Sequence, residues 1–338
     1  MAVKERREAV LRAIVEDYIA RAVPVASSAI VEKHGLRVSP ATIRNDTAYL
    51  EQEGYVVRPH HSAGSVPTDK AYRYYVELIG QHIELPYAER YLIQRILEEA
   101  EEELEQWLRT VAAYLASLVH NLVVITSPKA ACCRLKHLDL VALQDFMALL
   151  IVVLYEARIR RQVLSFSSMV SQDELTRLAN KLTSLYAGMT GNEILAEQEG
   201  LSSEERQISE CLVEVIAAEE RVEHGEPYVE GLRLLLSQPE LASSSRMLKI
   251  LEVLEGEDWL RAIFSQELSR GGLKVVIGGE NPEPALQELS LITSPYGVPE
   301  KASGVVGVIG PKRMDYARAI SSLNCLTALL SNSVAEYV

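Results

Sequence analysis

The chain has 338 residues, 48% of them hydrophobic, and a formal net charge of −13 at neutral pH. Its length predicts two or three domains, each able to bury its own core. The negative balance excludes a chain that coats nucleic acid or an anionic membrane along its whole length, so any such contact must be local.

The first helical segments are short and have clear boundaries. Residues 4–21 place apolar side chains on one helical face, which predicts an amphipathic helix. Ser27 can cap a second, shorter helix, and Gly35 suits the C-terminal end of that helix.

The third helix has the strongest boundary signals. Ser39 offers an N-cap oxygen, Pro40 takes the first helical position, where its missing N–H costs nothing, and Gly54 ends the helix. The spacing i, i+4, i+7 predicts an inward face made of Ile43, Thr47 and Leu50. Residues 55–58 have the pattern of a strand, and a turn-rich loop and an aromatic-bearing helix follow. Three helices followed by a hairpin indicate a winged helix-turn-helix, which we assign to residues 1–83.

The remaining chain changes between helical and strand-like stretches. Residues 84–119 have helical periodicity with an acidic outer face, and strand-like segments with turn signals follow. Helical patterns return from about residue 172, and strands and a long apolar helix complete the chain. This order predicts an α+β domain, residues 84–167 plus 270–338, interrupted by a mostly helical insertion at 168–269.

Polar residues begin the third helix on the sides that its apolar face does not occupy: Thr42, Arg44 and Asn45. In a helix-turn-helix the second helix lies in the major groove, with its N-terminal residues at base edges. Arg can bond a guanine bidentately and Asn an adenine, each worth about 1–3 kcal/mol of discrimination. On the hairpin, Gly64 lets the backbone come close to a sugar-phosphate chain. The same loop offers Arg58, His60, His61 and Ser62.

Charge also favours the N-terminal segment as the part that contacts a polyanion. Residues 1–79 carry eleven Lys and Arg against ten Asp and Glu, whereas the other 259 residues carry a net −14. Winged helices also serve as protein–protein modules, and the acidic residues of this segment dilute its charge, so that alternative stays open. The pair His60–His61 could suggest a metal site, but no Cys or carboxylate stands at ligand spacing, so we expect no metal.

Two long motifs bracket nearly the whole chain. They are SPATIRNDTAYLEQEGYVVRPHHSAGSVPTDKAYRYYV, residues 39–76, and VVIGGENPEPALQELSLITSPYGVPEKASGVVGVIGPKRMDYARAI, residues 275–320. Both resemble the HrcA family, heat-inducible repressors of bacterial chaperone operons. The order of the elements between them also fits that family.

The resemblance implies a dimeric repressor with an N-terminal winged helix, a GAF-like α+β domain and a dimerisation domain inserted into the GAF-like part. It implies an inverted-repeat operator upstream of chaperone genes, which suits a two-fold dimer. It also implies that the GroEL chaperonin keeps the repressor competent for double-stranded DNA, and that repression lapses when heat-damaged proteins occupy GroEL. We therefore expect a DNA-bound homodimer with no catalysis and no cofactor.

Carried over to this sequence, the resemblance puts the start of the third helix where the family reads its operator and makes residues 59–68 the wing. The wing departs from the family pattern, since His61 stands where Thr is usual and Ser65 where Arg is usual. Loss of that Arg should weaken DNA binding and flatten its salt dependence. The candidate DNA-contacting residues are Ser39, Thr42, Arg44, Asn45, Arg58, His60, His61, Ser62, Gly64 and Ser65.

The motif GVIGPKRMDY, residues 307–316, allows two interpretations. Its Gly307 and Gly310 permit tight turns, Pro can start a helix, and Lys312–Arg313 beside the start of that helix could hold an anion. In the alternative, which we favour, the motif is a strand-to-helix corner whose Gly and Pro residues are conformational. The core residues of that corner would be Met314 and Tyr316.

The sequence has no P-loop, nucleophile elbow or HExxH motif, so we expect no enzyme. The rival hypothesis is a winged-helix regulator whose GAF-like domain senses a small-molecule effector. That sensor would need a sizeable pocket in residues 120–166 plus 272–310.

The four cysteines form no CxxC pair and the longest apolar run is about half a membrane span, so we expect a cytoplasmic protein with no membrane segment.

Overall fold

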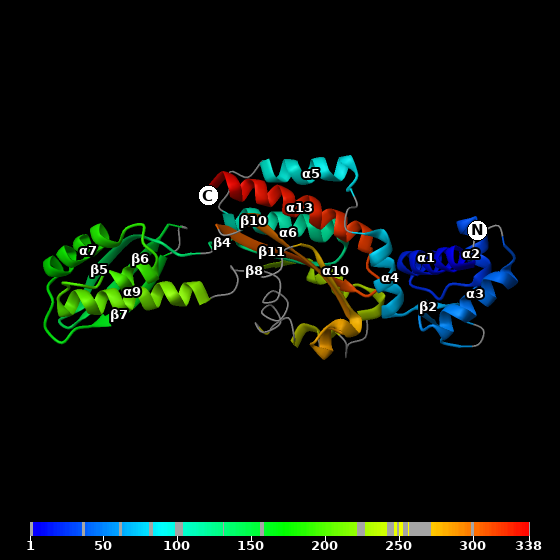
Figure 1. Ribbon diagram of the computed structural model, residues 1–338, viewed down its shortest axis with the longest axis horizontal. Coiled ribbons are helices and arrows are strands. Elements are labelled where there is room, and N and C mark those ends of the chain that lie inside the picture. Colours follow the sequence, from blue (N-terminus) through cyan, green and yellow to red (C-terminus); the bar gives the residue numbers. More distant parts are fainter. Residues whose placement is uncertain are drawn as a thin grey trace. The chain divides into compact units, whose positions relative to one another are not determined.

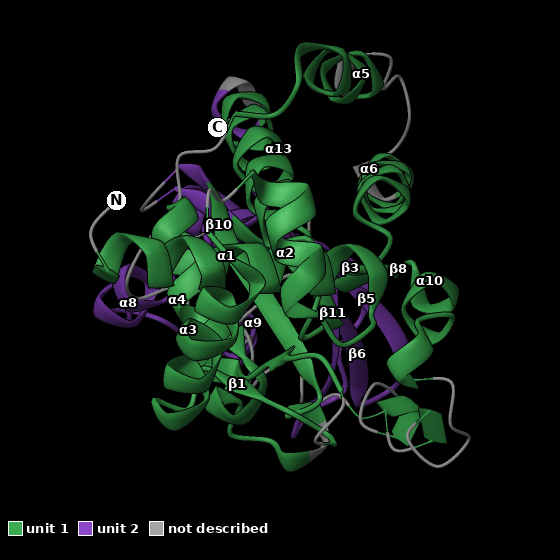
Figure 2. Cartoon of the chain, turned by 90° about the vertical axis from the view of Figure 1, so that its right-hand side faces the viewer, with its two compact units in different colours: residues 1–127, 226–296, 304–333 green, residues 128–225, 297–303, 334–338 purple. Residues whose placement is uncertain are grey.

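The computed structural model describes residues 3–35, 38–60, 63–80, 84–98, 104–130, 132–155, 159–221, 227–241, 247–248, 250–252, 256, 272–298 and 301–337. The chain divides into two compact units, shown in different colours in Figure 2. Unit 1 comprises residues 1–127, 226–296 and 304–333, and unit 2 comprises 128–225, 297–303 and 334–338. Both contain helices and strands, so the predicted α+β class is confirmed.

The N-terminal part of unit 1 is helical and ends in a short hairpin (Figure 1). Its elements are α1 (Val3–Arg21), α2 (Ser27–His34), α3 (Pro40–Gln52), β1 (Val56–Val57), β2 (Val66–Pro67) and α4 (Asp69–Ile79). The strands pair antiparallel, with Val57 opposite Val66. The predicted inward face of α3 is confirmed, because Ile43, Thr47 and Leu50 are all buried.

The rest of unit 1 is built on a sheet of strand order β8-β3-β11-β10-β9, with β4 beside β11. Its strands are β3 (Leu122–Thr126), β4 (Lys129–Ala130), β8 (Pro227–Glu230), β9 (Lys274–Ile277), β10 (Leu289–Val298) and β11 (Ala302–Pro311). Every residue of β3 is buried, which explains why its sequence is a continuous apolar run and not an alternating one. The sheet is therefore covered on both faces.

The helices of this part of unit 1 come from distant parts of the sequence. They are α5 (Tyr87–Glu98), α6 (Leu104–Val119), α10 (Leu232–Leu236), η1 (Pro239–Leu241), η2 (Gly278–Glu280), η3 (Pro284–Leu286) and α13 (Tyr316–Tyr337). Leu122 and Val124 of β3 pack with Leu235 of α10 and Leu241 of η1. On the other side, α6 and α13 lie along the sheet (Figure 1). Strand β8, from the segment predicted as a helical insertion, pairs with β3 in this sheet.

Unit 2 contains an antiparallel sheet of order β5-β6-β7 packed against helices. Its elements are β5 (Leu135–Gln144), β6 (Met147–Leu154), β7 (Ile159–Ser165), α7 (Gln172–Tyr186), α8 (Gly191–Ala196) and α9 (Ser203–Arg221). Alternate strand residues such as Leu138 and Val152 form a core with Leu182 of α7 and Leu212 of α9. The sequence predicts strand-like segments here, and the structure contains them as β5, β6 and β7 of unit 2.

The GVIGPKRMDY motif differs in detail from its prediction. Gly307 and Gly310 lie inside strand β11 and form no turns, and the following helix begins at Tyr316. A Cβ at Gly310 would lie 2.3 Å from Asn121 Oδ1, so glycine is required there by close approach. Met314 and Tyr316 are buried, as the corner interpretation predicts.

Candidate nucleic-acid interface

The start of α3 is fixed by its own side chains. Ser39 has extended backbone angles (φ −73°, ψ 152°), and its Oγ accepts a hydrogen bond of 3.1 Å from the Thr42 N–H. The Ser39 Oγ and Thr42 Oγ1 atoms are 3.0 Å apart and form a second hydrogen bond. The predicted cap is confirmed, and it holds the first turn of α3 in one conformation before any ligand binds.

Arg44 and Asn45 follow Ile43 in the sequence and are both exposed. Ile43 and Asp46, on either side of them in the sequence, are buried, so the helix sends this pair outward. Neither Arg44 nor Asn45 has a hydrogen bond or ion pair with another residue in the part of the chain that the structure describes. Their donors and acceptors are therefore available to an external partner.

Asp46 has a role that sequence reasoning missed. We expected the acidic residues of this segment to dilute its charge, but the Asp46 side chain is only 3% exposed and accepts two hydrogen bonds from Arg6, at 2.6 and 3.0 Å. The hydrogen bonds from Arg6 hold the pKa of the Asp46 carboxyl below its usual range. Asp46 thus joins α3 to α1. The only sequence signal for this link is the presence of an acidic residue two positions after Arg44.

The candidate DNA-contacting residues of the hairpin differ in how far they are exposed. His60 is exposed, while Arg58 is half-buried with its Nε 3.5 Å from Glu51 Oε2, so its charge is partly neutralised. The predicted contacts His61 and Ser62 lie outside the described residues. Of the hairpin's described basic residues, Arg58 therefore presents less free charge than the sequence suggests.

Gly64 and Ser65 pack inward. A Cβ at Gly64 would lie 2.5 Å from the carbonyl carbon of Val25, so the missing side chain serves internal packing. Ser65 is 3% exposed, and its backbone exchanges two hydrogen bonds with Val25, of 2.8 and 2.9 Å. These two candidates anchor the hairpin to the chain before α2, and their side-chain positions are not at the surface.

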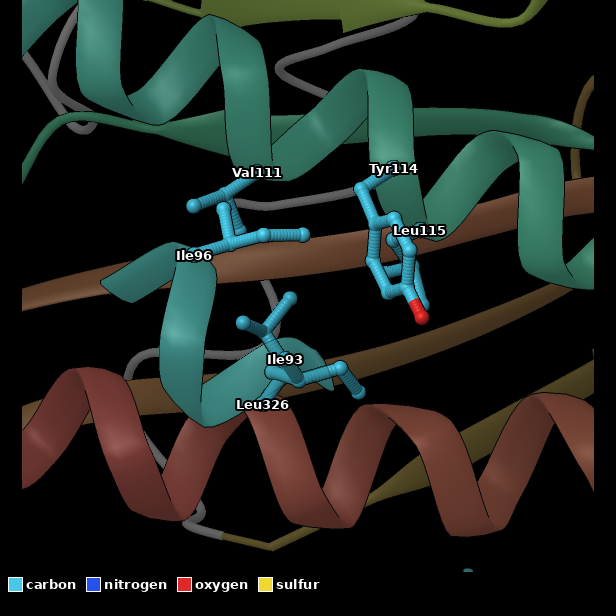
Figure 3. A pocket seen from close by; sticks show the side chains of 6 residues that line it. All are labelled: Ile93, Ile96, Val111, Tyr114, Leu115 and Leu326. Atoms are coloured by element: carbon cyan, nitrogen blue, oxygen red, sulfur yellow. The ribbon is translucent and has the colours of Figure 1, made fainter. Parts of the chain in front are cut away.

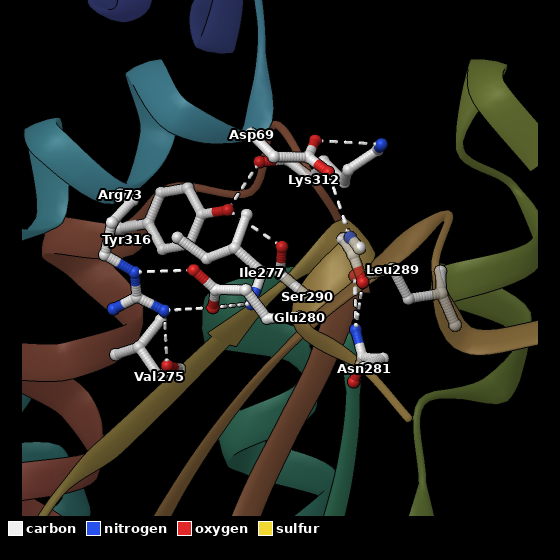
Figure 4. A network of polar contacts seen from close by, with 12 residues as sticks. Asp69, Arg73, Val275, Ile277, Glu280, Asn281, Leu289, Ser290, Lys312 and Tyr316 are labelled. Atoms are coloured by element: carbon white, nitrogen blue, oxygen red, sulfur yellow. Dashed lines mark hydrogen bonds and ion pairs between the residues drawn. The ribbon is translucent and has the colours of Figure 1, made fainter. Parts of the chain in front are cut away.

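Helix α4 joins the N-terminal helices to the sheet of unit 1 through a polar network (Figure 4). The Asp69 carboxylate accepts a hydrogen bond of 2.9 Å from Gly279 N–H and pairs with Lys312 Nζ at 2.9 Å. One turn further along α4, Arg73 binds the Glu280 carboxylate and donates to the Val275 carbonyl oxygen at 2.7 Å. These bonds orient α4 relative to β9 and η2.

The cations of the GPKRMDY corner are held internally. Lys312 pairs with Asp69, and Arg313 forms an ion pair with Glu240. Arg313 also donates to Gln238 Oε1 at 2.9 Å and to the Ile19 carbonyl oxygen at 3.2 Å. This pairing supports the strand-to-helix corner over an anion site.

The cavities of unit 1 bear on the effector hypothesis. An apolar gap between α5, α6 and α13 is lined by side chains such as Ile93, Tyr114 and Leu326 (Figure 3), but it holds only about 10 Å³, roughly the minimum for a single water molecule and far too little for an effector. A larger, open cleft of about 580 Å³ lies between the hairpin, α4 and the Lys312–Arg313 corner. Its lining lies almost entirely outside the residues in which we expected a sensor pocket.

The described residues contain no group of three or more His, Cys, Asp and Glu side chains that could hold a metal ion. Among the same residues, no helix combines the length and apolar character needed to cross a membrane.

Comparison with known proteins identifies the family. Residues 105–320 match the family model described as the HrcA protein C-terminal domain. A heat-inducible transcription repressor HrcA from Dehalococcoides mccartyi is 40% identical over 98% of this chain and 96% of its own length. The chain belongs to the HrcA family. A second HrcA repressor, from Chloroflexus aggregans, is 36% identical over 98% of this chain and 93% of its own length.

The HrcA relatives extend the similarity to the N-terminal helices. The family model begins at residue 105 and so does not include α3, whereas the relative from Dehalococcoides mccartyi aligns over 331 residues. Among solved structures, a hypothetical protein at 2.2 Å resolution matches with a TM-score of 0.63 and 24% identity, covering 98% of this chain and 99% of its own. That match supports the fold over the whole length.

Proposed function

We propose that this HrcA-family chain is a heat-inducible transcription repressor that binds double-stranded DNA as a homodimer. The observation that carries the proposal is the pair Arg44 and Asn45, exposed and unpaired within the described residues at the start of a capped helix. The names of its relatives, at 35–41% identity, support the same conclusion.

In this proposal, α1 to α3 with the β1–β2 hairpin form a winged helix-turn-helix, and α3 is the recognition helix. Arg44 and Asn45 contact base edges in the major groove, and Thr42 contacts the backbone beside them. His60 and Arg58 on the hairpin meet phosphates, with Ser39 mainly capping the helix. The α+β body is the GAF-like domain of the family, and the protein acts in the cytoplasm without catalysis.

The dimer is supported by an apolar sheet face in unit 2. Cross-strand register puts Val141, Leu149 and Val163 in one row and Val153 and Ile159 in another, on the face opposite the α7 and α9 core. Val141 is 37% exposed, Val163 45% and Ile159 58%. Monomeric proteins rarely expose a contiguous apolar patch of several such side chains, so this face suits a contact with another protein surface.

The same face carries complementary charges. Asp139 and Arg161 flank Ile151 in the middle row of the sheet. In a two-fold contact the same patch meets itself, so Asp139 of one copy can pair with Arg161 of the other. We propose this face as the contact through which two copies place their α3 helices on the half-sites of an inverted repeat.

Oligomeric state tests the dimer. We expect sedimentation equilibrium of the full chain to give a dimer and Ile151→Glu to give a monomer, because a buried carboxylate would face its own copy. Leu185→Glu is the matched control, since Leu185 is an exposed residue of α7. A wild-type monomer, or a dimer unaffected by Ile151→Glu, would remove this face from the proposal.

DNA preference tests the function itself. The full chain would be titrated on an inverted-repeat chaperone operator and on a scrambled duplex at several salt concentrations, with and without GroEL. We expect the operator to be preferred by several kcal/mol and the active fraction to rise with GroEL. Equal, weak binding to both duplexes would favour a protein-binding module or an effector-dependent regulator instead.

A further inference from the structure

Beside the proposed recognition helix, one carboxylate faces two arginines of α1. Arg6 binds Asp46 through both Nε and Nη2, at 2.6 and 3.0 Å, and these bonds raise the pKa of the Arg6 guanidinium. Arg7 approaches the same carboxylate only through Nε, at 3.4 Å. One negative charge thus faces two positive charges, and the surplus positive charge lies on Arg7.

The position of Arg7 is set by an aromatic ring of α3. Its guanidinium carbon lies 3.5 Å from the centroid of the Tyr49 ring, the geometry of a cation–π contact. Arg7 keeps 32% of its side-chain surface exposed, and Tyr49 is 38% exposed. Arginine has five N–H donors, and the four on the two Nη atoms of Arg7 have no acceptor among the described residues.

Tyr49 lies on the face that carries the proposed base-reading residues. It follows Asn45 by four residues, which puts the two side chains on one side of α3, about 6 Å apart along the axis. Ala48, between them on the exposed surface, is too small to cover either. A DNA backbone that leaves the groove next to Asn45 would therefore run past the Tyr49 ring and the Nη atoms stacked on it.

We propose that Arg7 and Tyr49 form a phosphate-binding pair that holds the DNA backbone beside the recognition helix. Arg7 donates from its Nη atoms to a phosphate. The Tyr49 ring holds the guanidinium stacked against it, with the Nη atoms directed outward. Asp46 positions Arg7 by accepting a hydrogen bond from its Nε, while Arg6 makes the shorter bonds to the same buried carboxylate. This inference rests on the proposed DNA-binding function and adds a contact that carries charge and no base information.

The test is a salt-dependent titration of the full-length protein on operator and scrambled duplexes. We expect Arg7→Ala to weaken binding to both duplexes on the order of tenfold, with the operator preference retained. For a dimer, the slope of log K against log salt should fall by about two, one for each lost phosphate contact. Arg7→Lys keeps the charge and should restore the slope.

Controls separate this contact from folding and from base reading. Arg12→Ala removes an arginine of the same helix that is paired with Glu16 at 2.7 Å, and it should change neither affinity nor slope. Asp46 keeps its two Arg6 bonds in Arg7→Ala, so the circular dichroism and melting temperature of that variant should stay close to wild type.

Three results would overturn the inference. If Arg7→Ala leaves affinity and slope unchanged while Arg44→Ala loses operator preference, the proposed function stands and the phosphate pair is wrong. If Arg7→Ala abolishes operator preference, Arg7 reads bases and not phosphate. If the wild type does not prefer the operator, the proposed function fails and this inference fails with it.

Discussion

The starts of α3 and of α13 carry the same kinds of residue and use them in opposite ways. Before α13, Lys312 pairs with Asp69, and Arg313 binds Glu240 and Gln238. In α3, Arg44 and Asn45 are exposed and have no partner among the described residues. A basic residue near the start of a helix can thus bind an external anionic partner only when the rest of the chain leaves its charge unpaired.

The difference follows from what surrounds each helix. The corner before α13 contacts α1, α4, η1 and Gln238, so its cations would be costly without acidic partners. The outer face of α3 meets solvent, so Arg44 incurs no burial cost and needs no partner. The two arginines should therefore respond differently to mutation, one through stability and the other through binding.

The largest expected effect on stability is at Arg313. Its side chain is 15% exposed and that of Glu240 is 27% exposed. Arg313→Met leaves the Glu240 charge without its main partner, and we expect a loss of about 2–4 kcal/mol in the free energy of unfolding, less than for a fully buried pair because solvent reaches Glu240. Urea denaturation measures it. The double variant with Glu240→Gln should recover part of the loss, and no recovery would contradict an ion-pair role.

Asp46 should show a smaller loss that depends on pH. Its folded pKa is lowered by Arg6, so the stabilisation is fully present above the unfolded pKa of about 3.9 and is lost as pH falls through the folded value. We expect Asp46→Asn to cost about 1–3 kcal/mol at pH 7. The difference from wild type should shrink below about pH 4 in urea denaturation. A difference that does not change with pH would contradict this assignment.

Next in size is Gly278, which lies under Asp69 at the joint between α4 and η2. Its φ is +50°, and a Cβ there would lie 2.3 Å from Asp69 Oδ2. We expect Gly278→Ala to cost about 1–2 kcal/mol, from the left-handed backbone and the displaced carboxylate. Gly279→Ala is a matched control, since its Cβ would lie at an ordinary 3.6 Å from the same atom. Equal losses in thermal melts would refute the steric explanation.

The smallest effect on stability should come from Arg44. Because this side chain is exposed and unpaired within the described residues, we expect Arg44→Ala to change the free energy of unfolding by no more than about 0.5 kcal/mol. Urea denaturation beside Arg313→Met makes the comparison direct. A loss at Arg44 as large as that at Arg313 would show that Arg44 is structural.

Much of this contrast could be predicted from local sequence, and some of it could not. The Ser39 cap and the inward face of α3 follow from rules that act within a few residues, and the structure confirms them. The pairing of Asp46 with Arg6 spans 40 positions, and that of Arg313 with Glu240 spans 73. No spacing rule reaches that far, so the sequence could not tell a free cation from a paired one.

The same limit applies to the strands of unit 2 and to two glycines. The pattern of β5 to β7 predicts strands, but which sheet they join depends on pairing partners that periodicity does not encode. Gly64 and Gly310 looked like residues for backbone freedom or ligand approach. The structure assigns both to close contacts, with Val25 and Asn121, made by residues distant in the sequence.

The most direct test of the account is operator preference in matched variants of the two regions. Arg44→Ala and Asn45→Ala would be titrated on operator and scrambled duplexes beside Lys312→Ala. We expect each α3 variant to lose about 1–3 kcal/mol of preference per half-site, and Lys312→Ala to keep it. Preference retained in both α3 variants, or lost as strongly in Lys312→Ala, would contradict the assignment of α3 as the reading surface.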